Sequence, residues 1–244
     1  MKKQIMLLAI VLGGVFSLQA QEKQDSPSQS KQEVSPQIRK KGTDWSKQPI
    51  GYFYGGIGVG YILSTEDVEG LPDSAMTTGL EWRLGMSRYY NRWGWGVLVQ
   101  QFRIKQSFPL TDGYQTATLE DVGRLLYIAP QFTGRWVLGE KLTIYGAVGW
   151  GWLRYKETAK IGGSGDITAT ANTLGGNFTV GLEYRLNSVI GLSVDAGLIG
   201  GELGKMKVDD DELQAFFDEA YTGKMDASRL YATAGVHIYI WKKK

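Results

Sequence analysis

The sequence predicts an all-β fold, an eight-stranded antiparallel up-and-down transmembrane β-barrel. First, the chain holds eight segments in which apolar and polar residues alternate, the period of a strand with two different faces. Second, short and long connections alternate strictly between these segments. Third, the final segment, 228–241, continues its apolar face almost to the end of the chain. A closed barrel needs such a terminal strand to pair with the first one.

The first 20 residues have the pattern of a secretory signal peptide. Lys2 and Lys3 form a basic start, an apolar run covers 5–18, and the small-residue cleavage site 18–20 follows. The apolar run is too short for a spanning helix, and a retained anchor helix is the alternative. The chain contains no cysteine. Lipid attachment at a processed cysteine and a disulfide framework are therefore excluded.

Residues 21–48 differ in composition from the rest of the chain. They are dominated by Ser, Gln, Lys, Glu and Pro and contain few large apolar side chains. Such a segment cannot bury enough surface to offset the entropy lost on ordering. We expect a disordered N-terminal extension here, followed by one barrel domain over 49–244. Removal of residues 1–20 leaves 25 basic and 25 acidic residues, a balance that argues against a nucleic-acid partner.

Period-two alternation predicts the strands in order along the chain. Their ranges are 50–63, 76–88, 93–104, 122–137, 142–155, 173–186, 189–200 and 228–241. In the third strand the large apolar residues change face between Val99 and Phe102, which predicts a bulge near Gln100 and Gln101. Pro130 in the fourth strand cannot donate a ladder hydrogen bond, so a local irregularity is expected there.

The connections predict two different ends of the barrel. Tight turns are expected around 89–92, 139–141 and 187–188. Long loops are expected over about 64–75, 105–121, 156–172 and 201–227. Because consecutive strands are antiparallel, the four long loops lie at one end, the loop end. The tight turns and both chain termini lie at the other, the turn end.

The two strand faces distinguish a membrane barrel from a soluble barrel or sandwich, which would place its large apolar residues inside. One face carries Trp, Leu, Ile and Val over strands long enough to cross a bilayer at a tilt. The other carries Gly, Thr, Ser, Asn and a few charges, which suits a narrow polar lumen. Aromatic residues near the strand ends are expected to form girdles at headgroup level. They are Tyr89, Tyr90, Trp93, Trp95, Trp136 and Tyr184 at the turn end, and Tyr61, Phe102, Trp152 and Tyr155 at the loop end.

Over about 50–241 the chain resembles the eight-stranded outer-membrane β-barrel proteins of Gram-negative bacteria, the porin-like and OmpA- or OmpX-like barrels. The resemblance rests on the signal peptide, the alternating connections and the final strand. In that family the barrel assembly machinery reads a pattern in the last strand, which is matched here by Thr233, Gly235, Ile238 and Ile240. The family often ends on an aromatic residue, whereas Trp241 is followed by three lysines. The resemblance implies an integral protein of the cell outer membrane, in contact with outer-membrane lipids, with 21–48 in the periplasm and the long loops outside the cell.

Polar side chains on the inner face form the candidate site, a lumen polar network. Its members are Glu81, Arg83, Gln131, Arg135, Asn177, Glu183, Arg185, Asp195 and His237. Charges in a narrow lumen should pair rather than stay bare. The interior of an eight-stranded barrel is just wide enough to be filled by side chains. We therefore expect a salt-bridged plug rather than an open pore.

No catalytic, cofactor or metal site is expected. The glycine pairs of the chain lie inside strands rather than at a strand-to-helix turn, so they do not form a nucleotide-binding fingerprint. His237 is the single histidine, and a Ser-His-Asp or His–metal site would have to use it. Its inward position near the turn end favours a hydrogen-bonded interior residue instead. Catalytic carboxylate pairs stay an open alternative, because spacing alone does not exclude them.

The last long loop has a pattern of its own. Leu213, Phe216, Phe217 and Ala220 share one apolar face of a short predicted helix, preceded by the acidic run 209–212. This loop helix is expected to pack over the barrel rim or to bind an extracellular ligand, a partner or the outer leaflet. The acidic run lacks the spacing of an EF-hand calcium loop.

The sequence thus predicts a non-enzymatic outer-membrane barrel with a structural or surface-interaction role through its four long loops. One alternative is small, gated, porin-like transport of small solutes. A second alternative is an outer-membrane lipid-modifying enzyme.

Overall fold

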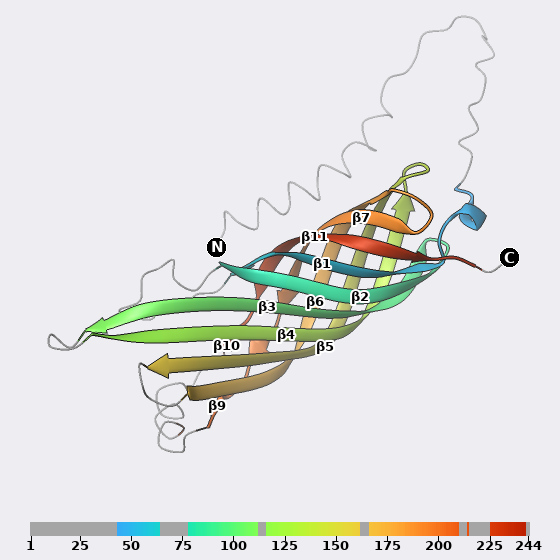
Figure 1. Cartoon of the computed structure of the whole chain (residues 1–244). Helices are drawn as coiled ribbons and strands as arrows, with labels where there is room; N and C mark the ends of the chain where they lie inside the picture. The colour runs from blue at the N-terminus through green and yellow to red at the C-terminus, as the bar shows by residue number, and fades with distance from the viewer. Residues whose placement is uncertain are drawn as a thin grey trace, which may run out of the picture. The chain divides into compact units, whose positions relative to one another are not determined.

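The computed structural model of the chain describes residues 43–63, 78–111, 116–161, 166–209, 214 and 225–242. Within these ranges the chain is built almost wholly of β-strands (Figure 1). No helix in the described ranges is long and apolar enough to cross a membrane. The expected signal peptide, 1–20, and the segment 21–42 lie outside the described residues and stay predictions.

Eight strands form a closed antiparallel ring. They are β1 (Gly51–Ile62), β2 (Thr78–Tyr90), β3 (Trp93–Thr111), β4 (Thr116–Val137), β5 (Leu142–Ile161), β6 (Asp166–Arg185), β7 (Ile190–Gly200) and β11 (Arg229–Ile240). Each strand pairs with the strands that precede and follow it around the ring, and β1 pairs with β11 from Gly51 opposite Ile240 to Ile62 opposite Arg229. This pairing confirms the eight-stranded up-and-down barrel, closed by its first and last strands.

Four strands are longer than predicted, and the expected long loops 105–121 and 156–172 are wrong. β3 pairs with β4 without interruption from Trp93 to Thr111, and β5 pairs with β6 as far as Lys160 opposite Asp166. The outer parts of these strands, which we call the projecting hairpins, extend beyond the ring (Figure 1). They were missed because their outward positions carry mostly polar side chains, so the apolar alternation ends before the strand does.

The last connection folds back onto the barrel. β8 (Glu202–Leu203) pairs with β10 (Met225–Asp226), and β9 (Lys207–Val208) pairs with β6. Leu203 and Ala227 are buried in the same apolar cluster as Leu153 on β5. Part of the predicted loop 201–227 therefore covers the loop-end mouth. The predicted loop-helix residues Leu213, Phe216, Phe217 and Ala220 lie outside the described residues.

Two irregularities were predicted in the ladder, a bulge in β3 and a disturbance at Pro130 in β4, and the structure contains only the second. Pairing of β3 with β2 and with β4 is continuous, so the bulge near Gln100 and Gln101 is wrong. Gln100 and Phe102 both face the interior, where Phe102 packs in an apolar cluster with Leu125 and Leu153. At Pro130 the expected irregularity is present, since the β4–β5 ladder omits Ala129 and Pro130.

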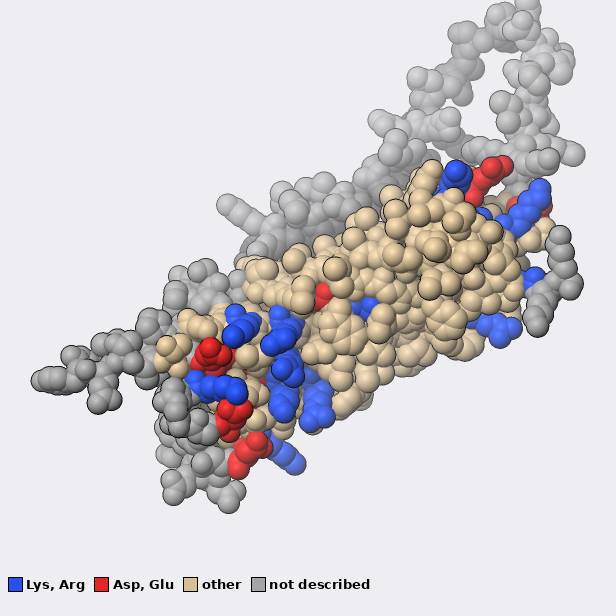
Figure 2. All heavy atoms as spheres, in the orientation of Figure 1, with Lys and Arg blue, Asp and Glu red and all other residues tan. Residues whose placement is uncertain are grey.

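The exterior of the ring is apolar, and Figure 2 shows it as a nearly uncharged band. Ile57, Trp150 and Val194 each expose more than 60% of their surface. This inside-out arrangement is that of a barrel surrounded by lipid rather than a soluble barrel. The exposed girdle residues are Tyr90, Trp93, Trp95, Trp136 and Tyr184 at the turn end and Tyr61 and Trp152 at the loop end. Tyr89, Phe102 and Tyr155 were assigned wrongly, because their side chains lie on the inner face.

Candidate functional site

All nine residues of the predicted lumen network lie on the inner face. Alternation along each strand places them there, with the large apolar residues on the outer face. Glu81, Arg83, Gln131, Arg135, Asn177, Glu183, Asp195 and His237 are buried, and Arg185 is half-buried. Their contacts fall into groups that follow one another from the loop end to the turn end.

The group nearest the loop end contains a fully buried ion pair. Arg229 on β11 places Nη2 3.3 Å from Glu81 Oε1 on β2, across the intervening strand β1. Gln100 Nε2 donates to the same carboxylate oxygen at 2.9 Å. The guanidinium lies 5.7 Å from the ring centre of Phe102. Arg229 and Gln100 were not among the predicted site residues, although both have the inward parity of their strands.

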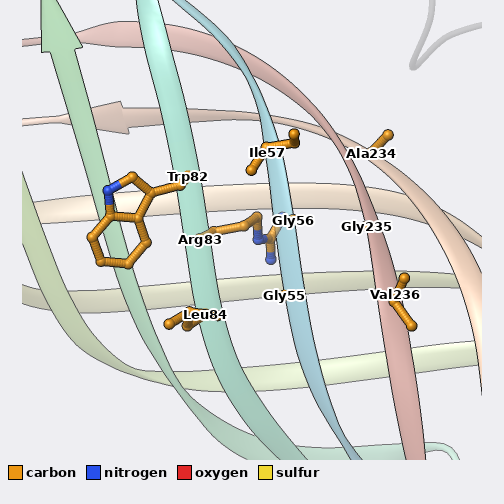
Figure 3. A pocket seen from close by; sticks show the side chains of 9 residues that line it. All are labelled: Gly55, Gly56, Ile57, Trp82, Arg83, Leu84, Ala234, Gly235 and Val236. Carbon is orange, nitrogen blue, oxygen red and sulfur yellow. The ribbon is translucent and has the colours of Figure 1, made fainter.

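The central group crosses the seam between the first and last strands. Arg83 Nη1 lies 3.3 Å from Asp195 Oδ2 on β7, and both side chains are 3% exposed. Gly56 on β1 lies directly opposite Arg83, and Gly235 on β11 lies opposite Gly56. Because neither glycine has a side chain, the arginine can pass over both strands, and Figure 3 shows it directed toward Gly56. Thr233 donates to Asp195 Oδ2 at 3.4 Å.

The group nearest the turn end is built around Glu183. Its Oε2 lies 2.7 Å from His237 Nδ1, and its Oε1 accepts from the hydroxyl of Tyr239 at 2.7 Å. The imidazole stacks on Tyr52 with a centroid separation of 4.2 Å. Both oxygens of the carboxylate and one face of the imidazole are therefore in contact with protein groups.

Tyrosines fill much of the remaining space and were not predicted as part of the site. Tyr54 donates to Gln131 Oε1 at 3.2 Å, and Tyr127 donates to Asn177 Oδ1 at 3.1 Å. Tyr52 and Tyr89 share a hydrogen bond of 2.9 Å. Strand parity could have placed these residues inside, but it does not reveal which side chains meet across the lumen.

The last two arginines of the network close the turn-end mouth. Arg135 donates to the carbonyl oxygens of Asn91 and Pro49, each at 2.8 Å, and Arg185 donates to Gln48 Oε1 at 2.6 Å. Among the described residues neither arginine forms an ion pair with a carboxylate, so their expected role in salt bridges is wrong. They hold the segment 43–50 across this end of the barrel instead.

That segment corrects the expected boundary of the N-terminal extension. Residues 43–48 were expected to be disordered, but a 3-10 helix, η1 (Trp45–Lys47), begins after Asp44, whose side chain accepts from the amide of Ser46. Trp45 lies 5.4 Å from the Arg135 guanidinium, and Pro49 is fully buried. The arginines at the mouth supply the contacts that the polar composition of the segment does not reveal.

A shallow depression of about 350 Å³ lies on the outer surface over the seam. Gly55 leaves a gap between the side chains of Leu84 and Val236, and Ile57 and Trp82 border it (Figure 3). Its exposed walls are apolar. It therefore resembles a lipid contact more than a catalytic cleft.

The structure gives no metal centre among the residues it describes. In these ranges no group of three His, Cys, Asp or Glu side chains could hold a metal ion. Of the acidic run 209–212, only Asp209 is described.

The residues matched to the assembly signal lie along β11. Thr233 faces the lumen and Gly235 lies at the seam, whereas Ile238 and Ile240 face outward. These positions leave the apolar pair on the lipid-facing surface, next to the end of the barrel where the chain terminates.

Asp121 is a buried carboxyl group on the inner face of the projecting hairpins, beyond the apolar band. Burial and the neighbouring Glu157 carboxylate raise the pKa of Asp121 to about 7. The hydroxyl of Tyr155 donates to Glu157 Oε2 at 2.6 Å, so Glu157 has a hydrogen-bond partner of its own. Because the folded pKa lies above the ordinary value of 3.8 for an aspartate, folding favours protonated Asp121.

The projecting hairpins should therefore lose stability as pH rises. The contribution of Asp121 is complete below about pH 3.8 and is lost by about pH 7. Hydrogen–deuterium exchange, corrected for the intrinsic rate, should show stronger protection of 119–124 and 156–160 at about pH 5 than at about pH 8. Asp121→Asn should remove this difference, whereas Glu120→Gln, which alters an outward carboxylate, should retain it. Equal protection of the unmodified chain at both pH values would contradict the assignment.

Comparison with known proteins gives structural similarities only. No protein-family model and no curated protein sequence matches the chain. Neisserial surface protein A (NspA) is 12% identical with a TM-score of 0.44, covering 78% of this chain and 97% of its own. Ail of Yersinia pestis, in complex with the heparin analogue sucrose octasulfate, is 14% identical with a TM-score of 0.41, covering 77% and 96%.

The outer membrane protein OprG of Pseudomonas aeruginosa is 12% identical with a TM-score of 0.44, covering 79% of this chain and 97% of its own. All three TM-scores lie below 0.5. The fold of this chain is accordingly defined by its own strand pairing, as a closed eight-stranded antiparallel barrel with an apolar exterior.

Proposed function

We propose that the chain is a non-enzymatic integral protein of the outer membrane, with a lumen filled by side chains. It would act through the surface that it presents at the loop end, in a structural role or in contact with an extracellular ligand or partner. The observation that supports this proposal is the series of buried side-chain contacts along the described part of the lumen, from the Leu203 cluster to the segment held by Arg135. A filled lumen leaves the outer surface and the loop end as the parts available for contact.

The surroundings of His237 weigh against the lipid-modifying enzyme. The imidazole is 1% exposed, is paired with Glu183 and is stacked on Tyr52. A general base must reach the proton that it removes, and here the ring is buried, with Nδ1 next to Glu183 and one face against Tyr52. Replacement of His237 should therefore alter barrel stability without changing the lipid A profile of the host.

Conductance in planar bilayers separates a filled barrel from the gated porin-like alternative. The purified chain should give no steady openings, because the ion pairs Arg83–Asp195 and Arg229–Glu81 cross its interior. The double variant Arg135→Ala, Arg185→Ala, which releases the turn-end segment, should also remain closed for the same reason. Steady openings of the unmodified chain would overturn the proposal, and openings of the double variant alone would favour a gated pore.

We also propose that Thr233, Gly235, Ile238 and Ile240 are read by the barrel assembly machinery. Their support is the match to the family pattern and the outward position of the two isoleucines. Gly235→Ala should slow insertion in cells, whereas Gly58→Ala, which leaves these four residues unchanged, should not.

A further inference from the structure

We propose that four cations on the outer face of the barrel form a binding surface for phosphorylated lipid headgroups. Arg103 on β3, Arg124 on β4, and Arg154 and Lys156 on β5 are all exposed. We call this set the basic row. Figure 2 shows Lys and Arg side chains gathered at the border between the apolar band and the loop end.

Strand register brings these cations together. Arg103 lies directly opposite Arg124, and Arg124 lies directly opposite Lys156. Arg154 is opposite Leu126, one outward position closer to the apolar band. Three adjacent strands therefore present cations side by side. Like charges directly opposite each other on a sheet are destabilising. An anion from outside the chain would offset this repulsion.

Neighbouring cations on the same strands show that the chain pairs charges elsewhere. Lys105 lies 3.3 Å from Glu120, and Lys160 lies 2.9 Å from Asp166. Both pairs are farther from the apolar band than the basic row. Among the described residues, none of the four basic-row cations has a carboxylate within ion-pair distance. Acidic side chains therefore pair with the cations farther from the apolar band, but not with those at the level of the lipid headgroups.

The height of the basic row follows from the apolar band. On β4 the outward positions from Trp136 to Leu126 carry no polar side chain. At about 3.3 Å per residue and a tilt of about 40°, this stretch spans roughly 25 Å, the height of a lipid-facing band. Arg124 is the next outward position beyond Leu126 toward the loop end. It lies two residues farther along the strand and thus about 5 Å higher, within the headgroup layer.

The chemistry of the basic row fits monophosphate groups better than zwitterionic headgroups. Arginine forms paired hydrogen bonds to phosphate oxygens, and lysine adds a point charge. On β6, Thr170 lies opposite Lys156 and Asn172 lies opposite Arg154, which adds neutral polar groups beside the cations. Below them, Trp152 and Leu174 are exposed for contact with acyl chains. We therefore assign the occupant as an outer-leaflet lipid whose headgroup carries phosphate monoesters, an inference that rests on the proposed membrane placement.

Native mass spectrometry of the purified chain in detergent micelles tests this assignment. Diphosphorylated lipid A should remain bound to the unmodified chain, and the same glycolipid without phosphates should not. The variant Arg103→Gln, Arg124→Gln, Lys156→Gln should weaken lipid A binding by about tenfold or more, since it removes three charge-assisted contacts. The matched variant Arg88→Gln, Arg92→Gln, Lys141→Gln removes three charges at the turn end and should bind as the unmodified chain does.

Three outcomes would overturn the assignment: equal binding by the basic-row variant, equal binding of the glycolipid without phosphates, and displacement by inorganic phosphate as effective as by lipid A. A heat-dependent shift in gel mobility confirms in each case that the variant barrel is folded. The result is independent of conductance, so a barrel that conducts ions would overturn the filled-lumen proposal and leave the lipid result unaffected.

Discussion

Arg229→Met is expected to destabilise the barrel by about 3–5 kcal/mol. The substitution removes the cation but leaves the Glu81 carboxylate fully buried, with the Gln100 amide as its remaining polar contact. An uncompensated buried charge costs far more than the net value of the pair, because both ions lost their hydration on folding. The measurement is urea-induced unfolding in phosphatidylcholine vesicles, followed by tryptophan fluorescence.

A double variant separates the cost of the bare charge from the loss of packing. Adding Glu81→Gln to Arg229→Met should recover much of the loss, since the remaining groups are neutral. Lys105→Met removes one partner of an exposed pair and should change stability by about 1 kcal/mol or less. If Arg229→Met cost as little stability as Lys105→Met, the Glu81–Arg229 pair would not be shielded from water.

Gly235→Ala is expected to cost about 1–3 kcal/mol by overpacking. A Cβ atom at this position would collide with the carbonyl oxygen of Gly55, which belongs to the rigid backbone of β1. The collision falls on the seam that closes the barrel, so β1 and β11 would have to move apart. Urea-induced unfolding and heat-dependent gel mobility of refolded protein both report the effect.

Two further variants assign that effect to its cause. Gly204→Ala adds a Cβ with no atom within 4 Å and should be neutral. Gly58→Ala creates a tighter collision across the same seam, with the backbone of Ala232 and Thr233, but leaves the four residues of the assembly signal unchanged. Both seam variants should lose stability after refolding in vitro, whereas Gly235→Ala alone should also slow insertion in cells. Similar insertion of the two seam variants would count against a signal role for Gly235.

The strand count, their order and the faces of most residues could be predicted because alternation has a period of two over the lipid-facing band. That signal ends where the surroundings change. Beyond Arg124 the outward positions face headgroups or water, so the outer parts of β3–β6 have no continuous apolar face. They were therefore predicted as loops. Inside the barrel, Phe102 belongs to an apolar cluster, and its inward position led to the wrong prediction of a bulge.

The contacts of the lumen could be predicted only in part. Parity placed Glu81, Arg83 and Asp195 inside, but pairing depends on the strand tilt and on glycines that let a long side chain cross two strands. The partner of Glu81 was therefore missed, although Arg229 has inward parity. Arg135 was expected to bind a carboxylate and instead holds the segment before β1, a contact that no local pattern encodes.

Cysteine accessibility tests the filled lumen most directly, because the chain contains no cysteine. Thr179 is fully buried inside the barrel, and Ser107 is exposed on the outer face of a projecting hairpin. Thr179→Cys should react with a small water-soluble thiol reagent about 100-fold more slowly than Ser107→Cys, since reaction would require opening of the packed interior. Both should react equally after unfolding. Equal rates in the folded barrel would mean that water and small solutes reach the centre of the lumen, which would contradict the account.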